Sequence, residues 1–402
     1  MPTASPNAWI GPLVMTLLVQ SVSSFLQRMP PTIAPALMEA HGLQPQMIGY
    51  FSASNICGSI AFLVMGAPLL RRYGSVRSLQ IGLCLGAFGA LVFMLPLTPL
   101  LVMGTVLMGL GYGPSTPAGS DILQRHAPAR HRVLIFSIKQ AGVPAGGILA
   151  GLVLPQLIEI GGLDLCLLAC CFFPLVTALL ITPYRHLDPP QDNTQKIDFA
   201  SFLSFDNLKK PFAALTTHPD LFKLALSGTC LAVGQGVWIA FLVTLLVRLL
   251  GMSLTTAGLY FSIMQVTGVF GRILLGFIAD RLGSGRTTLR LNAVFSVLTT
   301  LALMFLSPDW PLWAVALLCG CAGVTVTSWN GVQIAEIARL APLEHLREAS
   351  SGATLILFCG YIIGPVGFAL TMALTGGIIT GLVGTCVLIS LSLLMMPKEK
   401  SY

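Results

Sequence analysis

The chain has 402 residues, of which 55% are hydrophobic and only 9% are charged, and its mean hydropathy is +0.84. A soluble domain carries about 25% charged residues. The composition therefore excludes an ordinary soluble protein and indicates that lipid is the solvent, where only helices or a closed barrel satisfy the backbone. The apolar runs are far longer than the strands of about 10 residues that a barrel needs. We predict an all-α integral membrane protein.

Twelve transmembrane helices are predicted from these runs, in two groups of six separated by a polar connection. Their expected limits are 10–38, 46–69, 78–97, 100–124, 133–158, 163–184, 220–249, 255–279, 287–307, 310–338, 349–374 and 377–396. Within the connection, residues 197–210 alternate bulky apolar and polar side chains. This pattern predicts a helix at the membrane interface, with Lys209 and Lys210 toward anionic lipid.

Lysine and arginine residues crowd the loops on one side of the predicted bundle. They include Arg71, Arg72, Arg77, Arg125, Arg130, Arg132, Arg185, Lys209, Lys210, Arg281, Arg286, Arg290, Arg339, Arg347, Lys398 and Lys400. The opposite loops carry only Arg248. Cytoplasmic loops are enriched in lysine and arginine, so the net charge of +7 reports topology rather than nucleic-acid binding. We expect both termini and the middle connection in the cytoplasm, and the protein in the inner membrane.

The two halves of the chain resemble each other. A shift of 209 residues aligns Gly42–Gly49 with Gly251–Gly258, and the same shift aligns 72–77 with 281–286. The pattern predicts a duplicated bundle, with a first six-helix bundle at 1–184, a linker at 185–219 and a second six-helix bundle at 220–402. Transporters built from such repeats bind their substrate near the membrane midplane, between the halves.

The connection after the eighth predicted span carries a recognisable motif. The stretch Gly276-Phe-Ile-Ala-Asp280-Arg281-Leu-Gly283-Ser-Gly-Arg286 resembles the loop signature of the major facilitator superfamily. This resemblance implies a fold of two pseudo-symmetric six-helix bundles and a gating role for Asp280, Arg281 and Arg286. The first half repeats the motif with Arg72 but has Arg71 where the second half has Asp280.

Three cations lie inside predicted spans with no acid at similar depth: Arg28, Lys139 and Arg272. A charge at bilayer depth costs about 2.5–3.5 kcal/mol on insertion scales, so such residues are rarely idle. Cations without acidic partners indicate that the missing negative charge arrives on a substrate. The pattern predicts a transporter for a small anion.

Family resemblance gives these cations expected roles. The arrangement around Arg272 resembles span eight of monocarboxylate porters and of the oxalate:formate antiporter, which implies that Arg272 binds a carboxylate. Arg28, just before Pro30 and Pro31, resembles the first-span arginine of anion:cation symporters. The residues after Lys139 are similar to the fifth-span motif of facilitator antiporters. Side chains as long as those of Arg28 and Lys139 can instead snorkel to the interface.

Neutral polar and aromatic side chains in the spans complete the predicted site. As substrate contacts beside the cations we expect Gln27, Gln140, Gln235, Trp238, Gln265, Asn330 and Tyr361. Glycines at 268, 271 and 276 are expected to let the helix of Arg272 approach its neighbours closely. Asp121 and Glu336 lie at aligned places of the repeat, near the cytoplasmic ends of their spans, where we expect gating ion pairs with loop arginines.

The sequence thus predicts a secondary transporter that moves an organic anion by alternating access, coupled to protons or to a counter-anion. An exporter of neutral drugs or metabolites, and a transporter of an inorganic anion such as cyanate or nitrate, remain alternatives. No enzyme motif, metal-ligand spacing or cofactor site is found among the ten cysteines and six histidines. The expected partners are the substrate, the coupling ion and lipid, and the protein is expected to be a monomer.

The charge asymmetry generates a first test. Reporter fusions at Asn193 and at Tyr402 are both expected to report a cytoplasmic location, because the positive-inside rule places the middle connection and the C-terminus there. The measurement is the activity ratio of a cytoplasmic and a periplasmic reporter at each site. A periplasmic signal at either site would overturn the twelve-span topology.

Overall fold

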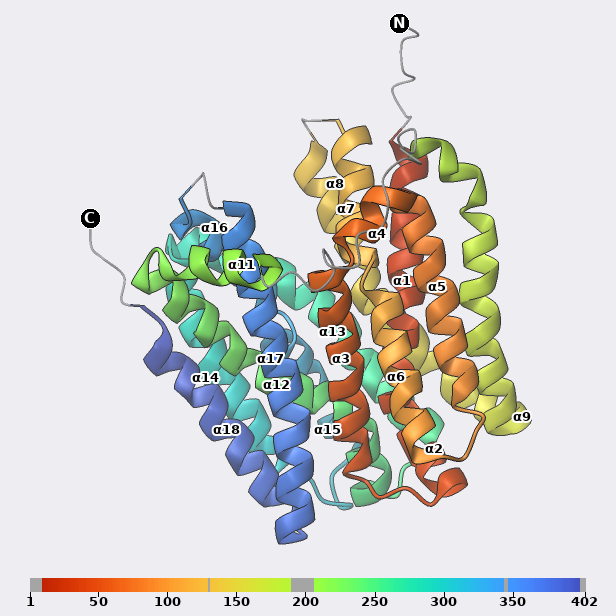
Figure 1. Cartoon of the computed structure of the whole chain (residues 1–402). Helices are drawn as coiled ribbons and strands as arrows, with labels where there is room; N and C mark the ends of the chain where they lie inside the picture. The colour runs from red at the N-terminus through yellow and green to blue at the C-terminus, as the bar shows by residue number, and fades with distance from the viewer. Residues whose placement is uncertain (1–8, 129–130, 189–205, 343–345, 398–402) are drawn as a thin grey trace, which may run out of the picture. The chain divides into compact units, whose positions relative to one another are not determined.

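The computed structural model describes residues 9–128, 131–188, 206–342 and 346–397, and every regular element in these ranges is a helix (Figure 1). Nine helical segments among them are long and apolar enough to cross a membrane. The prediction of an all-α membrane protein is therefore confirmed. The count of twelve crossings stays a prediction.

The helices follow one another as listed here in chain order. They are α1 (Ile10–Thr32), α2 (Ala34–His41), α3 (Met47–Met65), α4 (Ala67–Tyr73), α5 (Ser75–Val92), α6 (Thr98–Tyr112), α7 (Ser115–His126), α8 (Arg132–Gln140), α9 (Gly142–Leu180), the short 3-10 helix η2 (Thr182–Leu187), α11 (Asp206–Thr216), α12 (Pro219–Leu250), α13 (Leu254–Leu282), α14 (Gly285–Leu303), α15 (Leu312–Val326), α16 (Asn330–Leu340), α17 (Leu346–Thr375) and α18 (Ile378–Met395).

Contacts within the chain group these helices into two compact units. The first unit comprises residues 1–30 and 54–204, and the second comprises residues 31–53 and 205–402. The segment 31–53, which the sequence analysis assigned to the first bundle, groups with the second unit. The expected interfacial helix lies partly outside the described residues. Its visible part, α11, packs against α17, and Lys209 and Lys210 are exposed on it.

Proline and glycine break several of the predicted spans. The first predicted span consists of α1 and α2, which meet at Ile33, one residue before Ala34-Pro35 opens α2. Proline lacks a backbone N–H and is favoured in the first turn of a helix, where that N–H would have no partner. The fifth and sixth predicted spans are joined in α9, where Gly161 and Gly162 leave helical geometry and Gly162 has a φ of 73°. A left-handed φ of this kind is favourable only for glycine.

Glycines that the predicted repeat pairs with one another end helices with a positive φ. Gly42 and Gly251, 209 residues apart, have φ values of 61° and 62°, and both are left-handed. Gly74 and Gly283, related by the same shift, have φ values of 80° and 63°, but their ψ values of 172° and 14° differ, so only Gly283 has the left-handed helical conformation. That conformation is common where a glycine ends a helix. The agreement between Gly42 and Gly251 supports the alignment of the two halves at that turn.

Each unit is built around one well-packed helix. In the first unit α5 packs against α6 and α9 (Figure 1). In the second unit α12 packs against α17 and α18, and nearly all of its side chains from Leu231 to Leu246 are buried. Phe241 of α12 contacts Phe368 of α17, with ring centroids 4.6 Å apart. The apolar core of the second unit therefore lies around α12.

Two glycines of α17 provide a matched test of this packing. A methyl group at Gly360 would overlap the carbonyl oxygen of Thr229 on α12, whereas one at Gly367 would meet nothing within 4 Å. We expect Gly360→Ala to lower the free energy of unfolding by about 1–3 kcal/mol, as overpacking does. Gly367→Ala should leave it unchanged or raise it by up to about 1 kcal/mol. Thermal unfolding of both purified variants in detergent measures the difference, and equal losses would contradict the packing described.

Candidate functional site

Arg272 is half-buried on α13, one of the helices long enough to span a membrane. Two preceding glycines pack against α15 or the segment that follows it: a methyl group at Gly268 would lie 2.5 Å from Thr327 Oγ1, and one at Gly271 would overlap Ser328. The predicted close approach is thus confirmed at these two positions. At Gly276 the prediction is wrong, because among the described residues no atom of another helix lies within 4 Å of the place where its Cβ would stand.

Three of the predicted contact residues form one hydrogen-bonded group in the second unit. The Tyr361 hydroxyl donates to Gln235 Oε1 at 3.0 Å, and Asn330 Nδ2 donates to the same hydroxyl at 3.1 Å. The group joins α12, α16 and α17. Asn330 Oδ1 has no hydrogen-bond partner among the described residues. A buried acceptor without a partner is costly, so this oxygen is a candidate position for a ligand.

Gln265 and Trp238 are both buried, but they differ in whether their polar atoms have a hydrogen-bond partner. Gln265 is buried on α13, and within the described ranges its Nε2 has no hydrogen-bond partner, so it remains a candidate contact. Trp238 is buried on α12 and donates its indole N–H to Thr300 Oγ1 on α14 at 3.1 Å. Its polar atom is thus engaged within the core, and the ring packs there as an apolar side chain.

The predicted residues of the first unit differ in exposure. Gln27 and Arg28 are half-buried on α1. Lys139 is only 1% exposed at the end of α8, which argues against snorkelling, whereas its neighbour Gln140 is exposed. Because Arg28 and Arg272 belong to different units, their joint action on one substrate stays a prediction.

A buried charge cluster lies at the start of α14 in the second unit. Arg286 Nε lies 3.5 Å from Glu336 Oε2 on α16, and Arg286 Nη1 lies 4.0 Å from Asp220 Oδ2 on α12. Glu336 also pairs with Arg339 on its own helix at 3.0 Å. The expected pairing of Glu336 with a loop arginine is thus present. The cluster ties the ends of three helices together, which is the geometry that a gate at this end would need.

The other predicted gating residues are more exposed. Asp280 is exposed, and its side chain has no hydrogen-bond or ion-pair partner in the described part of the chain. Arg281 lies over the Phe277 ring at 5.0 Å, and Arg72 lies over the Tyr73 ring at 5.5 Å. Among the described residues, Glu336 and Asp220 are the acids beside Arg286, and Asp280 is not one of them. The gating roles of Asp280, Arg281 and Arg72 stay predictions.

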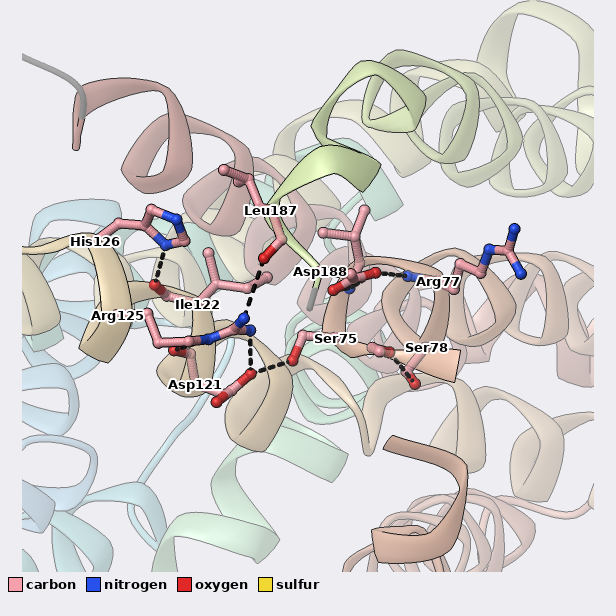
Figure 2. Close-up of polar contacts among 11 residues, drawn as sticks. Ser75, Arg77, Ser78, Asp121, Ile122, Arg125, His126, Leu187 and Asp188 are labelled. Carbon is pink, nitrogen blue, oxygen red and sulfur yellow. Dashed lines mark hydrogen bonds and ion pairs between the residues drawn. The ribbon is translucent and has the colours of Figure 1, made fainter. Parts of the chain in front are cut away.

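The equivalent end of the first unit carries a different arrangement (Figure 2). Asp121 of α7 pairs with Arg125, one turn further along the same helix, at 2.5 Å and accepts a hydrogen bond from Ser75 at 2.5 Å. Arg125 also donates to the Leu187 carbonyl oxygen at 3.1 Å. The expected pairing of Asp121 with an arginine counted among the loop cations is thus present, but Arg125 lies on α7 itself rather than in a loop.

Asp188 is a residue that the sequence analysis missed. Its carboxylate accepts hydrogen bonds from the backbone N–H of Val76 at 2.9 Å and of Arg77 at 3.4 Å, at the start of α5 (Figure 2). Ser284 caps the equivalent helix of the second unit itself, through Thr287 N at 3.0 Å. The first half lacks Asp280's counterpart, and Asp188 supplies an acid to this helix N-terminus from 112 residues away. No sequence motif near α5 or near Asp188 predicts this contact.

Comparisons with known proteins agree with this architecture. A family model described as Major Facilitator Superfamily matches residues 16–367. An uncharacterized MFS-type transporter of Mycobacterium tuberculosis is 25% identical over 314 residues, which cover 77% of this chain and 67% of that one. A 4-hydroxybenzoate transporter of Pseudomonas putida is 25% identical, over 62% of this chain and 61% of that one. A bacterial homolog of the human lysosomal transporter Spinster, solved in an inward-facing and occupied conformation, superposes with a TM-score of 0.76 at 15% identity, covering 98% of this chain and 97% of that one.

The two charge clusters predict different costs of losing an acid. Arg286 and Glu336 side chains are 6% and 8% exposed, whereas Arg125 and Asp121 are 32% and 52% exposed. Removing one partner of a buried pair costs about 3–5 kcal/mol, but an exposed pair contributes at most about 1 kcal/mol. We expect Glu336→Gln to lower the unfolding temperature well below that of Asp121→Asn. Thermal unfolding in detergent measures both, and equal or reversed losses would refute the ranking.

Proposed function

We propose that this chain, which belongs to the Major Facilitator Superfamily, is a secondary active transporter for a small organic anion with a carboxylate group. The observation that carries the proposal is Arg272, a half-buried arginine inside the span α13. The acid nearest to it along this helix, Asp280, lies about two turns further on and is exposed. A guanidinium donates two parallel hydrogen bonds, which suits the two oxygens of a carboxylate.

Relatives of this chain support the substrate class. Those named as 4-hydroxybenzoate transporters come from Pseudomonas putida and Pseudomonas aeruginosa. A further relative, 24% identical over 143 residues, is named as the hexuronate transporter of Bacillus subtilis. Both named substrates are monocarboxylates that also carry hydroxyl groups. The hydrogen-bonded group of Gln235, Asn330 and Tyr361 offers neutral polar atoms that suit such hydroxyls.

The mechanism that we propose is alternating access. Arg28 in the first unit and Arg272 in the second would each approach the substrate charge, and the two units would rock about it. The buried pair of Arg286 and Glu336 would tie α14 to α16 on the cytoplasmic side in one state and release them in the other. Transport would be coupled to proton symport or to anion exchange. The protein would lie in the inner membrane with both termini in the cytoplasm.

A second candidate is an exporter of neutral compounds. The observation that favours it is the close approach of α9 to α1: a methyl group at Gly142 would lie 2.9 Å from Gln20 Cβ, and one at Gly146 would overlap the Ser21 carbonyl oxygen. These glycines belong to the stretch that resembles the fifth-span motif of antiporters. The contact between α9 and α1 is explained by helix packing alone, without any ligand. It therefore supports a neutral-compound exporter less than Arg272 supports an anion transporter.

A panel of ligands decides between the candidates. Thermal shifts of the purified protein would be measured with 4-hydroxybenzoate, a hexuronate and nitrate, and with 4-hydroxybenzamide as the matched neutral compound. Stabilisation by an acid but not by its amide supports the carboxylate proposal. Equal stabilisation by acid and amide would favour the neutral-compound exporter. Stabilisation by nitrate that is lost in Arg272→Gln, with no stabilisation by the organic acids, would favour a transporter of an inorganic anion.

Substitution of Arg272 tests the proposal directly. We expect Arg272→Gln to weaken binding of the stabilising acid by about 30-fold to several thousand-fold, because losing one partner of a buried charged pair costs about 2–5 kcal/mol. Arg272→Lys should also fail, since an ammonium cannot form the bidentate contact. Arg248, exposed at the end of α12, provides the control Arg248→Gln, which should bind normally. Unchanged uptake of the acid by Arg272→Gln would refute the proposal.

A further inference from the structure

A second group of buried polar side chains lies inside the first unit, where α1, α7 and α8 meet. Its members are Thr16, Gln20 and Ser24 of α1, Ser115 of α7 and Lys139 of α8, and none is more than 2% exposed. The three α1 residues are spaced by four, so they lie along one face of that helix. All five belong to the first unit, so the group does not depend on Arg272 or on the second unit.

Glycines make room for this group. A methyl group at Gly119 on α7 would lie 2.9 Å from Lys139 Cε and 3.4 Å from its Nζ, with Thr16 Cβ at 3.7 Å. The lysine side chain therefore lies along the bare side of α7 and near α1. Ser115 precedes Gly119 by one turn and lies on the same face of α7. Lys139 and Thr16 thus meet beside Gly119, and Ser115 lies one helical turn from that contact.

The hydrogen bonds of the group are incomplete. Among the described residues, Lys139 Nζ and the hydroxyls of Ser24 and Ser115 have no hydrogen-bond partner, and neither has Gln20 Oε1. Gln20 donates through Nε2 to the Tyr112 hydroxyl at 3.2 Å. A half-turn of the amide would let Tyr112 donate to the Gln20 oxygen instead and would turn Nε2 toward the group.

No acid in the surrounding helices is available to Lys139. Neither α1 nor α8 contains an aspartate or glutamate, and the acids of α9, Glu159 and Asp164, are exposed near the far end of the part of α9 that begins at Gly142. The acid of α7 is Asp121, which is exposed and engaged with Arg125 and Ser75. The other charged groups on these helices are cations or histidine: Arg28, Arg125, His126 and Arg132. A buried ammonium without a counter-ion is strongly unfavourable, so an anion bound here would be stabilised.

We propose that this group is a second anion-binding site, wholly within the first unit, for a small monovalent anion. Lys139 supplies the charge, and the hydroxyl of Ser115 and the turned amide of Gln20 supply neutral donors. A halide, or the carboxylate end of an organic acid, has the required charge and size. A site of this kind, in addition to the Arg272 site, would let the protein exchange or cotransport two anions.

The experiment is a titration of the full-length purified protein in a zwitterionic buffer that contains a large organic cation but no halide and no carboxylate. Bromide and acetate are the probes, one for each source of the anion, and binding is followed by thermal shift and calorimetry. We expect saturable binding of at least one probe, weakened about 30-fold or more in Lys139→Met and about fivefold in Ser115→Ala. The control Arg248→Gln should bind both probes as the unmodified protein does, and the binding that depends on Lys139 should persist in Arg272→Gln.

Each further result has a definite meaning. Bromide binding that depends on Lys139 identifies an inorganic-anion site, and acetate binding alone identifies a carboxylate site. Should Lys139→Met fail to fold, Gly119→Ala replaces it, because the added methyl group would crowd Lys139 Cε. The proposal is overturned if neither probe binds saturably, or if binding is unchanged in these variants. Loss of binding in Arg272→Gln alone would place the anion at that site instead, leaving the carboxylate proposal intact.

Discussion

A membrane protein gains little by bringing two apolar helices together, because lipid tails are as apolar as the side chains that face them. In both units the helices instead touch through their backbones. A methyl group at Gly109 of α6 would overlap the Asn55 carbonyl oxygen of α3, and one at Gly364 of α17 would overlap that of Val233 on α12. Contacts this close leave no room for a side chain. They hold each unit together and set the positions of its polar residues.

This close packing explains how charge is distributed within each unit. At the arginine-rich end, acids and cations neutralise one another, as Glu336 does for Arg286 and as Asp121 does for Arg125. Deeper in the helices the cations have no acid of comparable depth on their own helix, and one of them, Lys139, is fully enclosed. Ion pairs at the helix ends can stabilise the fold without any other role. A charged residue inside a membrane-spanning helix is costly and rare, and it usually has a role in function.

The sequence predicted an all-helical membrane fold, because the length of an apolar helix is set by the thickness of the bilayer rather than by particular contacts. It also predicted that Gln235, Asn330 and Tyr361 are polar groups of the spans, and the structure joins them. What it could not predict depends on contacts between distant helices. Three such features depend on neighbours far along the chain. Trp238 donates a hydrogen bond to Thr300, Gly276 has open surroundings among the described residues, and Lys139 lies against Gly119. The same limit hid Asp188, whose partners lie in α5.

The position of Asp188 has a consequence for dividing the molecule into fragments. A gene cut after residue 184, at the expected end of the sixth span, would leave a first fragment without Arg185 and Asp188. The start of α5 would then lose its carboxylate partner, and Gln80 would lose the hydrogen bond that Arg185 donates at 2.8 Å. A fragment that continues through Asp188 retains both contacts. For co-expression of separate halves, the chain should therefore be divided after Asp188, several residues beyond the end of α9 at Leu180.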